Sequence, residues 1–151
     1  MPSRIVSGGQ TGVDRAALDA ALALGIPIGG WCPASRWAED GPIPARYPLR
    51  ETPHGDPAER TRRNVRDSDA TLVLTTSPAA GGALLTIEVA RALSRPHLVV
   101  DPFADPPAPA ADWLRALGGG VLNVAGPRES EAPGIGATAQ AWLSRALRDA
   151  L

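Results

Sequence analysis

The sequence contains no lysine, since all 15 of its basic residues are arginine. This absence excludes a lysine Schiff base of the kind that pyridoxal phosphate forms, a lysine general base, and the Gly-Lys-Ser/Thr end of a P-loop. The single cysteine excludes an internal disulfide and any metal site built from several cysteines. The two histidines, His54 and His97, lie too far apart in sequence to form a spaced zinc pair. We therefore expect neither pyridoxal phosphate nor zinc as a cofactor.

The net charge is also close to zero, and the apolar runs are short. The formal charge is -1, from 15 basic and 16 acidic residues, which argues against nucleic-acid binding by bulk charge. No apolar run approaches the ~20 residues needed to cross a bilayer. The amino terminus leads directly into the strand-like residues 4–9, so we expect no signal peptide, no membrane contact and a cytoplasmic location. A length of 151 residues predicts a single domain over residues 1–151.

Apolar periodicity predicts strands that alternate with helices. The expected strands are 4–7, 26–29, 70–76, 97–101 and 121–125, and the expected helices are 13–24, 56–68, 82–94, 106–117 and one after residue 136. Such alternation is typical of a parallel sheet covered on both faces. The sequence therefore predicts an α/β fold. We expect a single Rossmann-like domain of three layers, α/β/α, with about five strands in the order 2-1-3-4-5.

Two of these helices carry further predictions. Asp56 is placed to cap the second helix, and Glu59 lies where a capping box requires an acid. The same helix offers ion pairs of Asp56 with Arg60 and of Glu59 with Arg63. Its arginines therefore either form a solvated face or supply one guanidinium to a nearby site. The third helix, residues 82–94, is apolar on most sides, and we expect it to be deeply packed.

A glycine-rich turn follows the first expected strand, with the sequence Ser7-Gly8-Gly9-Gln10-Thr11-Gly12-Val13-Asp14. Glycine lets the backbone approach a ligand closely, and the start of a helix offers unpaired amides with partial positive charge, so an oxyanion fits there. A tight turn with a purely structural role is the alternative. The spacing is G-x-x-G instead of the G-x-G-x-x-G of a dinucleotide site, and Gly29-Gly30 stand where a ribose-binding acid would lie. These departures argue against NAD.

A second glycine-rich helix start, within residues 75–88, follows the third expected strand. In the order 2-1-3-4-5 the first and third strands are neighbours. The two glycine turns would then flank one crevice at the carboxyl edge of the sheet, where open α/β sheets bind ligands. We therefore expect an anionic ligand there. Glu88 in this helix has three open interpretations: a general base, a ribose contact, or an ion-pair partner of Arg91 or Arg95.

The long loop at residues 30–55 holds Trp31, Cys32, Arg36 and Tyr47. Aromatic rings with arginine over an anion crevice suit a flat, charged ligand, whereas packing within the loop is the alternative for Trp31 and Tyr47. We expect Cys32 to be buried and inert. No Ser/His/Asp catalytic set is recognisable, which favours a binding protein over an enzyme.

Long motifs along the chain resemble a known family. The segments are SGGQTGVDRAALDAA, GGWCP, AEDGPI, RYPL, NVRDSDATLVL, GGALLTIE and NVAGPRES. Together they are similar to the putative molybdenum carrier family. That family resembles the molybdenum cofactor carrier proteins and belongs to the SLOG group of lysine-decarboxylase-like Rossmann folds. The resemblance covers nearly the whole chain.

This resemblance implies molybdenum cofactor, molybdate or a related oxyanion as the ligand, self-association into a dimer or tetramer, and molybdoenzymes as partners. It implies a ligand site made from three segments, to which we add Trp31 and Arg36: Gly8, Gly9, Gln10, Thr11, Gly12 and Asp14 in the first turn, Ser77, Gly81, Gly82 and Thr86 in the second, and Arg128 and Ser130 in GPRES. One departure is Ala34-Ser35, where relatives often have Lys-Gly. The absent lysine could have contacted a phosphate, and Arg36 or Trp37 would have to make that contact instead.

Three functions remain open at this point, and a non-catalytic carrier of a phosphate- or oxometallate-bearing molecule is favoured. The first alternative is a nucleotide N-glycosidase that uses Glu88, since the second turn resembles the P-G-G-x-G-T-x-x-E motif of cytokinin-activating phosphoribohydrolases. Here, however, one residue separates Thr86 from Glu88 instead of two, which turns the acid about 100° around the helix. The second alternative is a sensor whose ligand controls a partner.

Overall fold

Five parallel strands form the central sheet of the computed structural model, which describes residues 1–151. The strands lie in the order β2-β1-β7-β5-β6. Their bounds are β1 Arg4–Val6, β2 Ile28–Gly29, β5 Ala70–Leu74, β6 His97–Val100 and β7 Val121–Ala125. The pairing is in register between β1 and β7, with Ile5 beside Leu122, and between β7 and β5, with Val124 beside Leu72.

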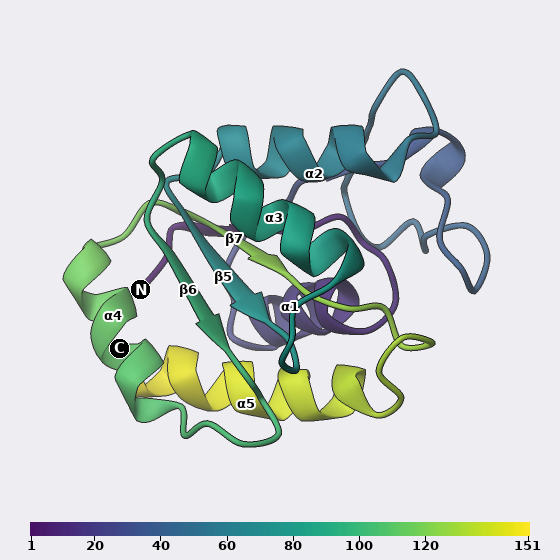
Figure 1. The fold of residues 1–151 in the computed structure, drawn as a ribbon. Helices are drawn as coiled ribbons and strands as arrows, with labels where there is room; N and C mark the ends of the chain where they lie inside the picture. Colours follow the sequence, from purple (N-terminus) through teal and green to yellow (C-terminus); the bar gives the residue numbers. More distant parts are fainter.

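Five helices cover the two faces of this sheet (Figure 1). Their bounds are α1 Val13–Ala23, α2 Pro57–Arg66, α3 Gly81–Ala92, α4 Ala108–Leu117 and α5 Ile135–Asp149. Helices α1, α4 and α5 lie on one face, and α2 and α3 lie on the other. The α/β class and the Rossmann-like arrangement predicted from the sequence are confirmed. No helix has the length and apolar character needed to span a bilayer.

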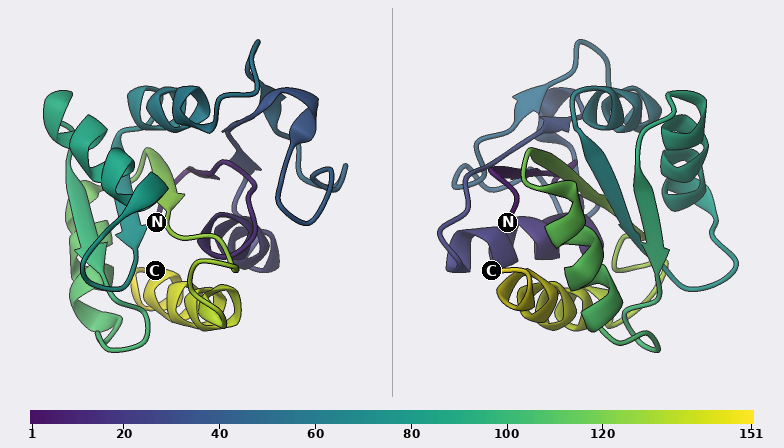
Figure 2. Two further views of the ribbon diagram at one scale, coloured as in Figure 1. Left: turned by 45° about the vertical axis from the view of Figure 1, so that its right-hand side comes forward. Right: turned by 90° about the vertical axis from the view of Figure 1, so that its left-hand side faces the viewer.

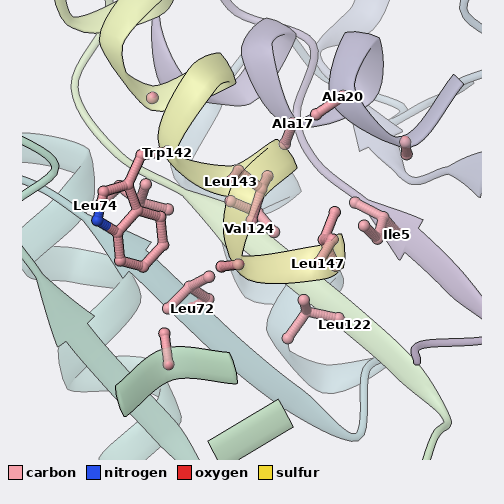
Figure 3. Close-up of a cluster of buried hydrophobic side chains, with 14 of the residues drawn as sticks. Ile5, Ala17, Ala20, Leu72, Leu74, Leu122, Val124, Trp142, Leu143 and Leu147 are labelled. Carbon is pink, nitrogen blue, oxygen red and sulfur yellow. The ribbon is translucent and has the colours of Figure 1, made fainter. Parts of the chain in front are cut away.

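The main core lies between the sheet and the face that carries α1, α4 and α5 (Figure 3). Alternate residues of each strand point to this side because side chains in a strand alternate between faces. Ile5, Leu72, Leu122 and Val124 do so, and they meet the stripe of α5 that includes Leu143. The 3.6-residue period of that helix explains why its apolar positions were predictable from the sequence.

The predicted strand order, 2-1-3-4-5, is wrong in one respect. The last strand, β7, lies between β1 and β5 instead of at the edge, so that the strands numbered along the chain follow the order 2-1-5-3-4. The edge is formed by β6, where Val99 is 42% exposed. The segment after β7 therefore lies between the two glycine turns that were predicted to be neighbours.

Three predictions about the helices on the other face are also wrong. Asp56 does cap α2, since its Oδ1 accepts a hydrogen bond of 3.0 Å from the amide of Ala58. Glu59 pairs with Arg63 at 2.8 Å, as predicted, but it does not return to the cap, and Arg60 pairs with Asp14 in place of Asp56. Helix α3 is not deeply packed, because only one side of it contacts the sheet while its outer side is exposed.

The long loop contains a second, two-stranded parallel sheet that the sequence did not reveal. Its strands are β3 Trp31–Cys32 and β4 Arg50–Glu51, and a short 3-10 helix, Ala34–Arg36, follows β3. A small core that includes Cys32 and Tyr47 packs beneath it. Both side chains are fully buried, so packing explains Tyr47, and Cys32 is buried as predicted.

Candidate anion-binding site

Three loops meet at the carboxyl edge of the sheet, after β1, β5 and β7. The loop after β7 contacts the turns on both sides. A Cβ atom added to Gly12 would lie 2.4 Å from the carbonyl oxygen of Pro127, and one added to Gly81 would lie 3.2 Å from Glu131 Oε2. Gly12 also has a φ of +76°, a backbone conformation that residues other than glycine rarely adopt. Glycine at position 12 therefore allows the first and third loops to touch.

A cavity of about 190 Å³ lies between these loops. It is bounded by the first turn, the second turn, the loop after β7, the start of α2 and the long loop. Its lining residues are Gln10, Trp37, Pro57, Arg60, Gly81, Gly82, Gly126, Arg128 and Glu131. Of the residues predicted from the sequence, the structure brings Gln10, Gly81, Gly82 and Arg128 to this cavity.

Arg60 reaches the cavity from α2 across the surface of Gly8. A Cβ atom at Gly8 would lie 2.0 Å from Arg60 Nη1, so only glycine leaves room for the guanidinium. Nη1 donates a hydrogen bond of 3.0 Å to Oδ2 of Asp14, which is 1% exposed. Burial raises the pKa of Asp14, while the charge of Arg60 opposes this shift. Asp14 therefore positions Arg60 and is not itself part of the lining.

Several donors around the cavity make no hydrogen bond within the chain. Arg60 Nε and Arg128 Nε are buried and make no hydrogen bond, although Arg128 Nε lies 3.5 Å from carboxylate oxygens of both Glu39 and Glu131. Helix α3 begins at Gly81 without a side-chain cap, so its first amides retain their partial positive charge. The space around Gly82 is open, since a Cβ atom there would meet nothing within 4 Å.

Gln10 joins the first turn to the long loop. Its side-chain Oε1 accepts hydrogen bonds from the amides of Thr11, at 3.0 Å, and of Glu39, at 2.9 Å. Other amides of the first turn are also used internally: that of Gly9 donates to Ser7 Oγ at 3.4 Å, and that of Val13 donates to the carbonyl of Pro127 at 3.2 Å. The first turn is therefore mainly structural, and the free donors come from α3 and the two arginines.

Glu39 closes the wall between the first turn and the loop after β7. It accepts hydrogen bonds from the hydroxyls of Thr11 and Ser130, the second at 2.5 Å, and from the amide of Ser130 at 3.2 Å. These bonds, led by that from the Ser130 hydroxyl, lower the pKa of Glu39. Thr11 and Ser130, both predicted as ligand contacts, thus bind a carboxylate of this chain.

Four other predicted contacts lie away from the cavity. Trp31 donates to Asp67 Oδ2 at 2.9 Å through its indole nitrogen. Arg36 donates to four backbone carbonyls of the long loop, including that of Tyr47 at 2.7 Å, so most of its guanidinium hydrogens are used within the loop. The Thr86 hydroxyl donates to the carbonyl of Gly82 at 2.8 Å. Ser77 lines a separate depression beside β6.

Glu88 lies on the outer side of α3, where it is exposed. It lines none of the described cavities, and it forms no ion pair with Arg91 or Arg95. A general base must lie within hydrogen-bond reach of its substrate. The geometry therefore does not support the role that Glu88 would have in a nucleotide N-glycosidase.

Five lining residues of the cavity were not among the predicted site residues: Trp37, Pro57, Arg60, Gly126 and Glu131. Trp37 was considered only as a replacement for the lost phosphate contact. Arg60 was one of several equivalent arginines in α2, and its contact with Gly8, which distinguishes it from the others, exists only in the folded chain. Gly126 is required because a Cβ atom there would lie 2.2 Å from the carbonyl of Leu74. Trp37 is 46% exposed, and its ring lies at the edge of the cavity.

A larger cavity of about 570 Å³ lies on the other side of the first turn. Its charged lining residues are four acids and one arginine: Asp19, Glu39, Asp40, Glu129 and Arg15. The negative excess disfavours an anion there. No group of three or more His, Cys, Asp or Glu side chains in the chain could hold a metal ion. The smaller, arginine-lined cavity is thus the site whose charges suit an anion.

The fold and this cavity define a Rossmann-like protein with an arginine-lined cavity at the carboxyl edge of its sheet. The chain belongs to the circularly permutated YpsA SLOG family, whose model matches residues 5–147. It is also similar to a crystal structure from Syntrophus aciditrophicus SB described as that of a putative molybdenum carrier protein, with 41% identity, a TM-score of 0.91, and coverage of 97% of this chain and 95% of that one. No curated protein sequence gives a significant match. The resemblance inferred from the motifs is confirmed.

Proposed function

We propose that this chain binds a small anionic ligand in the 190 Å³ cavity and carries it without chemical change. The observation that supports this proposal is the convergence of Arg60, Arg128 and the uncapped start of α3 on one cavity. Guanidinium groups and helix-start amides are the donors that oxyanions prefer, because charge-assisted hydrogen bonds are stronger than neutral ones. No set of residues for proton transfer accompanies them.

The proposed cargo is molybdate or the molybdenum cofactor, in line with the description of the related Syntrophus protein. The cavity has room for a tetrahedral oxyanion such as molybdate or a phosphate group. The rest of a larger ligand would extend past Trp37, whose exposed ring offers a stacking surface. Because no side-chain cluster suits a bare metal ion, the protein would hold molybdenum through the oxygen atoms of its ligand.

Native mass spectrometry with metal analysis of freshly purified protein tests this proposal. We expect the folded chain to retain a molybdenum-containing oxyanion or pterin, and to lose it when Arg128 is changed to Gln. If a nucleotide without molybdenum is bound, the anion site is supported and the proposed molybdenum cargo is rejected. Retention of the ligand by Arg128→Gln would place the site elsewhere. Release of ribose 5-phosphate from AMP, abolished by Glu88→Ala, would show an enzyme instead of a carrier.

A further inference from the structure

Helix α3 carries a second apolar stripe that the core does not use. The buried residues of this helix are Ala83, Thr86, Ile87 and Ala90. Val89, Ala92 and Leu93 are also spaced by three and four residues, so they lie together on another side of the helix. Leu93 is 44% exposed. This stripe is therefore apolar surface that the fold leaves open to solvent.

A groove of about 490 Å³ lies between this stripe and α2, and is here called the α2–α3 groove. Its α2 side is formed by residues three or four positions apart, which share one side of that helix. These residues are Glu59, Arg62, Arg63 and Arg66. Helices α2 and α3 lie side by side on one face of the sheet, and no other element lies over them (Figure 2). The volume is within the range of roughly 300–1,000 Å³ that is usual for pockets that bind small organic molecules.

The α2 side of the groove has more positive than negative charge, with three arginines and one acid. Glu59 pairs with Arg63 at 2.8 Å. Arg66 pairs with Asp67, which does not line the groove. Arg62 is exposed and forms no ion pair within the chain. The groove thus offers a free guanidinium opposite an apolar stripe.

We propose that the α2–α3 groove binds an amphipathic organic anion, namely a carboxylate joined to a hydrocarbon chain. The hydrocarbon would cover Val89, Ala92 and Leu93, because burial of apolar surface is favourable. The carboxylate would accept charge-assisted hydrogen bonds from Arg62. A small inorganic oxyanion would leave the apolar stripe uncovered, and a neutral hydrocarbon would leave the guanidinium without an acceptor. The groove shares no residue with the arginine-lined cavity, so this inference does not depend on the ligand of that cavity.

Isothermal titration of hexanoate, octanoate and decanoate into the full chain, below their micellar concentrations, tests the proposal. We expect saturable binding at one site per chain, with an affinity that rises about two- to fourfold for each added methylene group. Octanol has the same chain length as octanoate but no charge. It should bind about tenfold more weakly, because it cannot form the charge-assisted hydrogen bonds.

Two variants separate the polar and apolar contacts. Arg62→Gln removes the free guanidinium, and should weaken octanoate binding by about tenfold while leaving octanol binding unchanged. Leu93→Ser removes part of the apolar stripe, and should weaken the binding of both compounds by about fivefold. Arg148→Gln, at an exposed position of α5 on the other face of the sheet, is the charge control and should bind octanoate like the wild type. Arg128→Gln should do so too, because Arg128 lines the other cavity. Circular dichroism verifies that each variant is folded.

Four results would overturn the proposal. They are the failure of all three carboxylates to bind, an affinity that does not depend on chain length, equal binding of octanol and octanoate, and wild-type affinity for octanoate in both Arg62→Gln and Leu93→Ser. Binding of an acidic amphipathic peptide without binding of any of the carboxylates would assign the groove to a protein partner, and would overturn the proposal as well.

Discussion

Arg60 and Asp14 are 46 positions apart in sequence, yet they form a nearly buried ion pair in which Nη1 lies 3.0 Å from Oδ2. The pair lies directly beneath the first glycine turn, and it passes through the space that Gly8 leaves open. It fixes the guanidinium at the wall of the candidate cavity. Two residues on different elements thus link the fold of the first turn to the charge of the site.

Loss of this arginine should destabilise the protein. Arg60→Met leaves the Asp14 carboxylate buried without its partner, and we expect the free energy of unfolding to fall by about 3–5 kcal/mol at pH 7. Adding Asp14→Asn removes the unpaired charge and should recover part of the loss. Urea unfolding of the two single variants and the double variant measures the coupling. Additive effects of the two changes would contradict the buried pair.

The pH dependence of Arg60→Met follows from the raised pKa of Asp14. A carboxyl group whose pKa is higher in the folded state than in the unfolded state binds protons more tightly when folded. Removing Arg60 takes away the charge that opposes this shift, so the pKa of Asp14 is higher still in the variant, and the variant's stability deficit relative to wild type should shrink as the pH falls through the pKa of Asp14. A deficit that is the same at pH 7 and pH 4 would argue against this cause.

Two glycines of the site form a matched pair for substitution. Gly12→Ala requires a side chain at a φ of +76° and a Cβ atom 2.4 Å from a backbone oxygen, so the free energy of unfolding should fall by about 2 kcal/mol or more. Gly82→Ala meets open space within the first turn of α3, and the stability should be unchanged or higher by up to about 1 kcal/mol. Thermal or urea unfolding compares them. Equal costs at both positions would contradict the described contacts.

The hydrogen bonds of Glu39 should make the stability of the protein fall at acidic pH. Its hydrogen bonds hold its folded-state pKa below the ordinary value of 4.5, so the stability they supply is present above pH 4.5 and is lost as the pH falls through the folded-state pKa. Glu39→Gln should be less stable than wild type at pH 7, and its stability should change less between pH 5 and pH 3. Urea midpoints at several pH values measure this. An unchanged pH profile would show that Glu39 is not held in this way.

Glu131 is the one acid that lines the anion cavity, and it lies 3.5 Å from Arg128 Nε. Its negative charge opposes an anionic ligand and partly neutralises Arg128. Glu131→Gln should therefore increase the affinity for molybdate or phosphate by about fivefold at low ionic strength, and the gain should shrink as salt is added. Weaker binding by this variant would show that Glu131 orders Arg128 more than it repels the ligand.

Local patterns explain which features could be predicted from the sequence. The 3.6-residue period of α5 and the cap at Asp56 involve neighbouring residues, so the sequence alone was sufficient for them. The position of β7 could not be predicted, because strand order depends on contacts between distant segments. The predicted role of Arg36 was incomplete for the same reason: its charge suggested a ligand, whereas its four carbonyl partners come from the fold of the loop.

In the candidate site, too, local features were predictable and long-range contacts were not. Both glycine turns could be located from their residues. Their convergence was predicted, but from a strand order that is wrong. The structure brings them to one cavity only with the loop after β7 between them, which contributes Arg128 and Glu131. Trp31 and Trp37 are equivalent in the sequence, since both are aromatic residues of the long loop. Only the path of that loop places Trp37 at the cavity.

Isothermal titration of molybdate and of phosphate into the wild-type chain, Arg128→Gln and Gly82→Glu tests most directly whether the arginine-lined cavity is the ligand site. Gly82→Glu adds a negative charge where the structure has open space, and Arg128→Gln removes a positive one from a half-buried side chain whose two ion pairs are at 3.5 Å, so we expect both variants to fold. We predict saturable binding of at least one of the two anions at one site per chain, weakened by about tenfold or more in both variants. Binding that is unchanged in both variants, or a wild-type chain that binds neither anion, would contradict the proposed site.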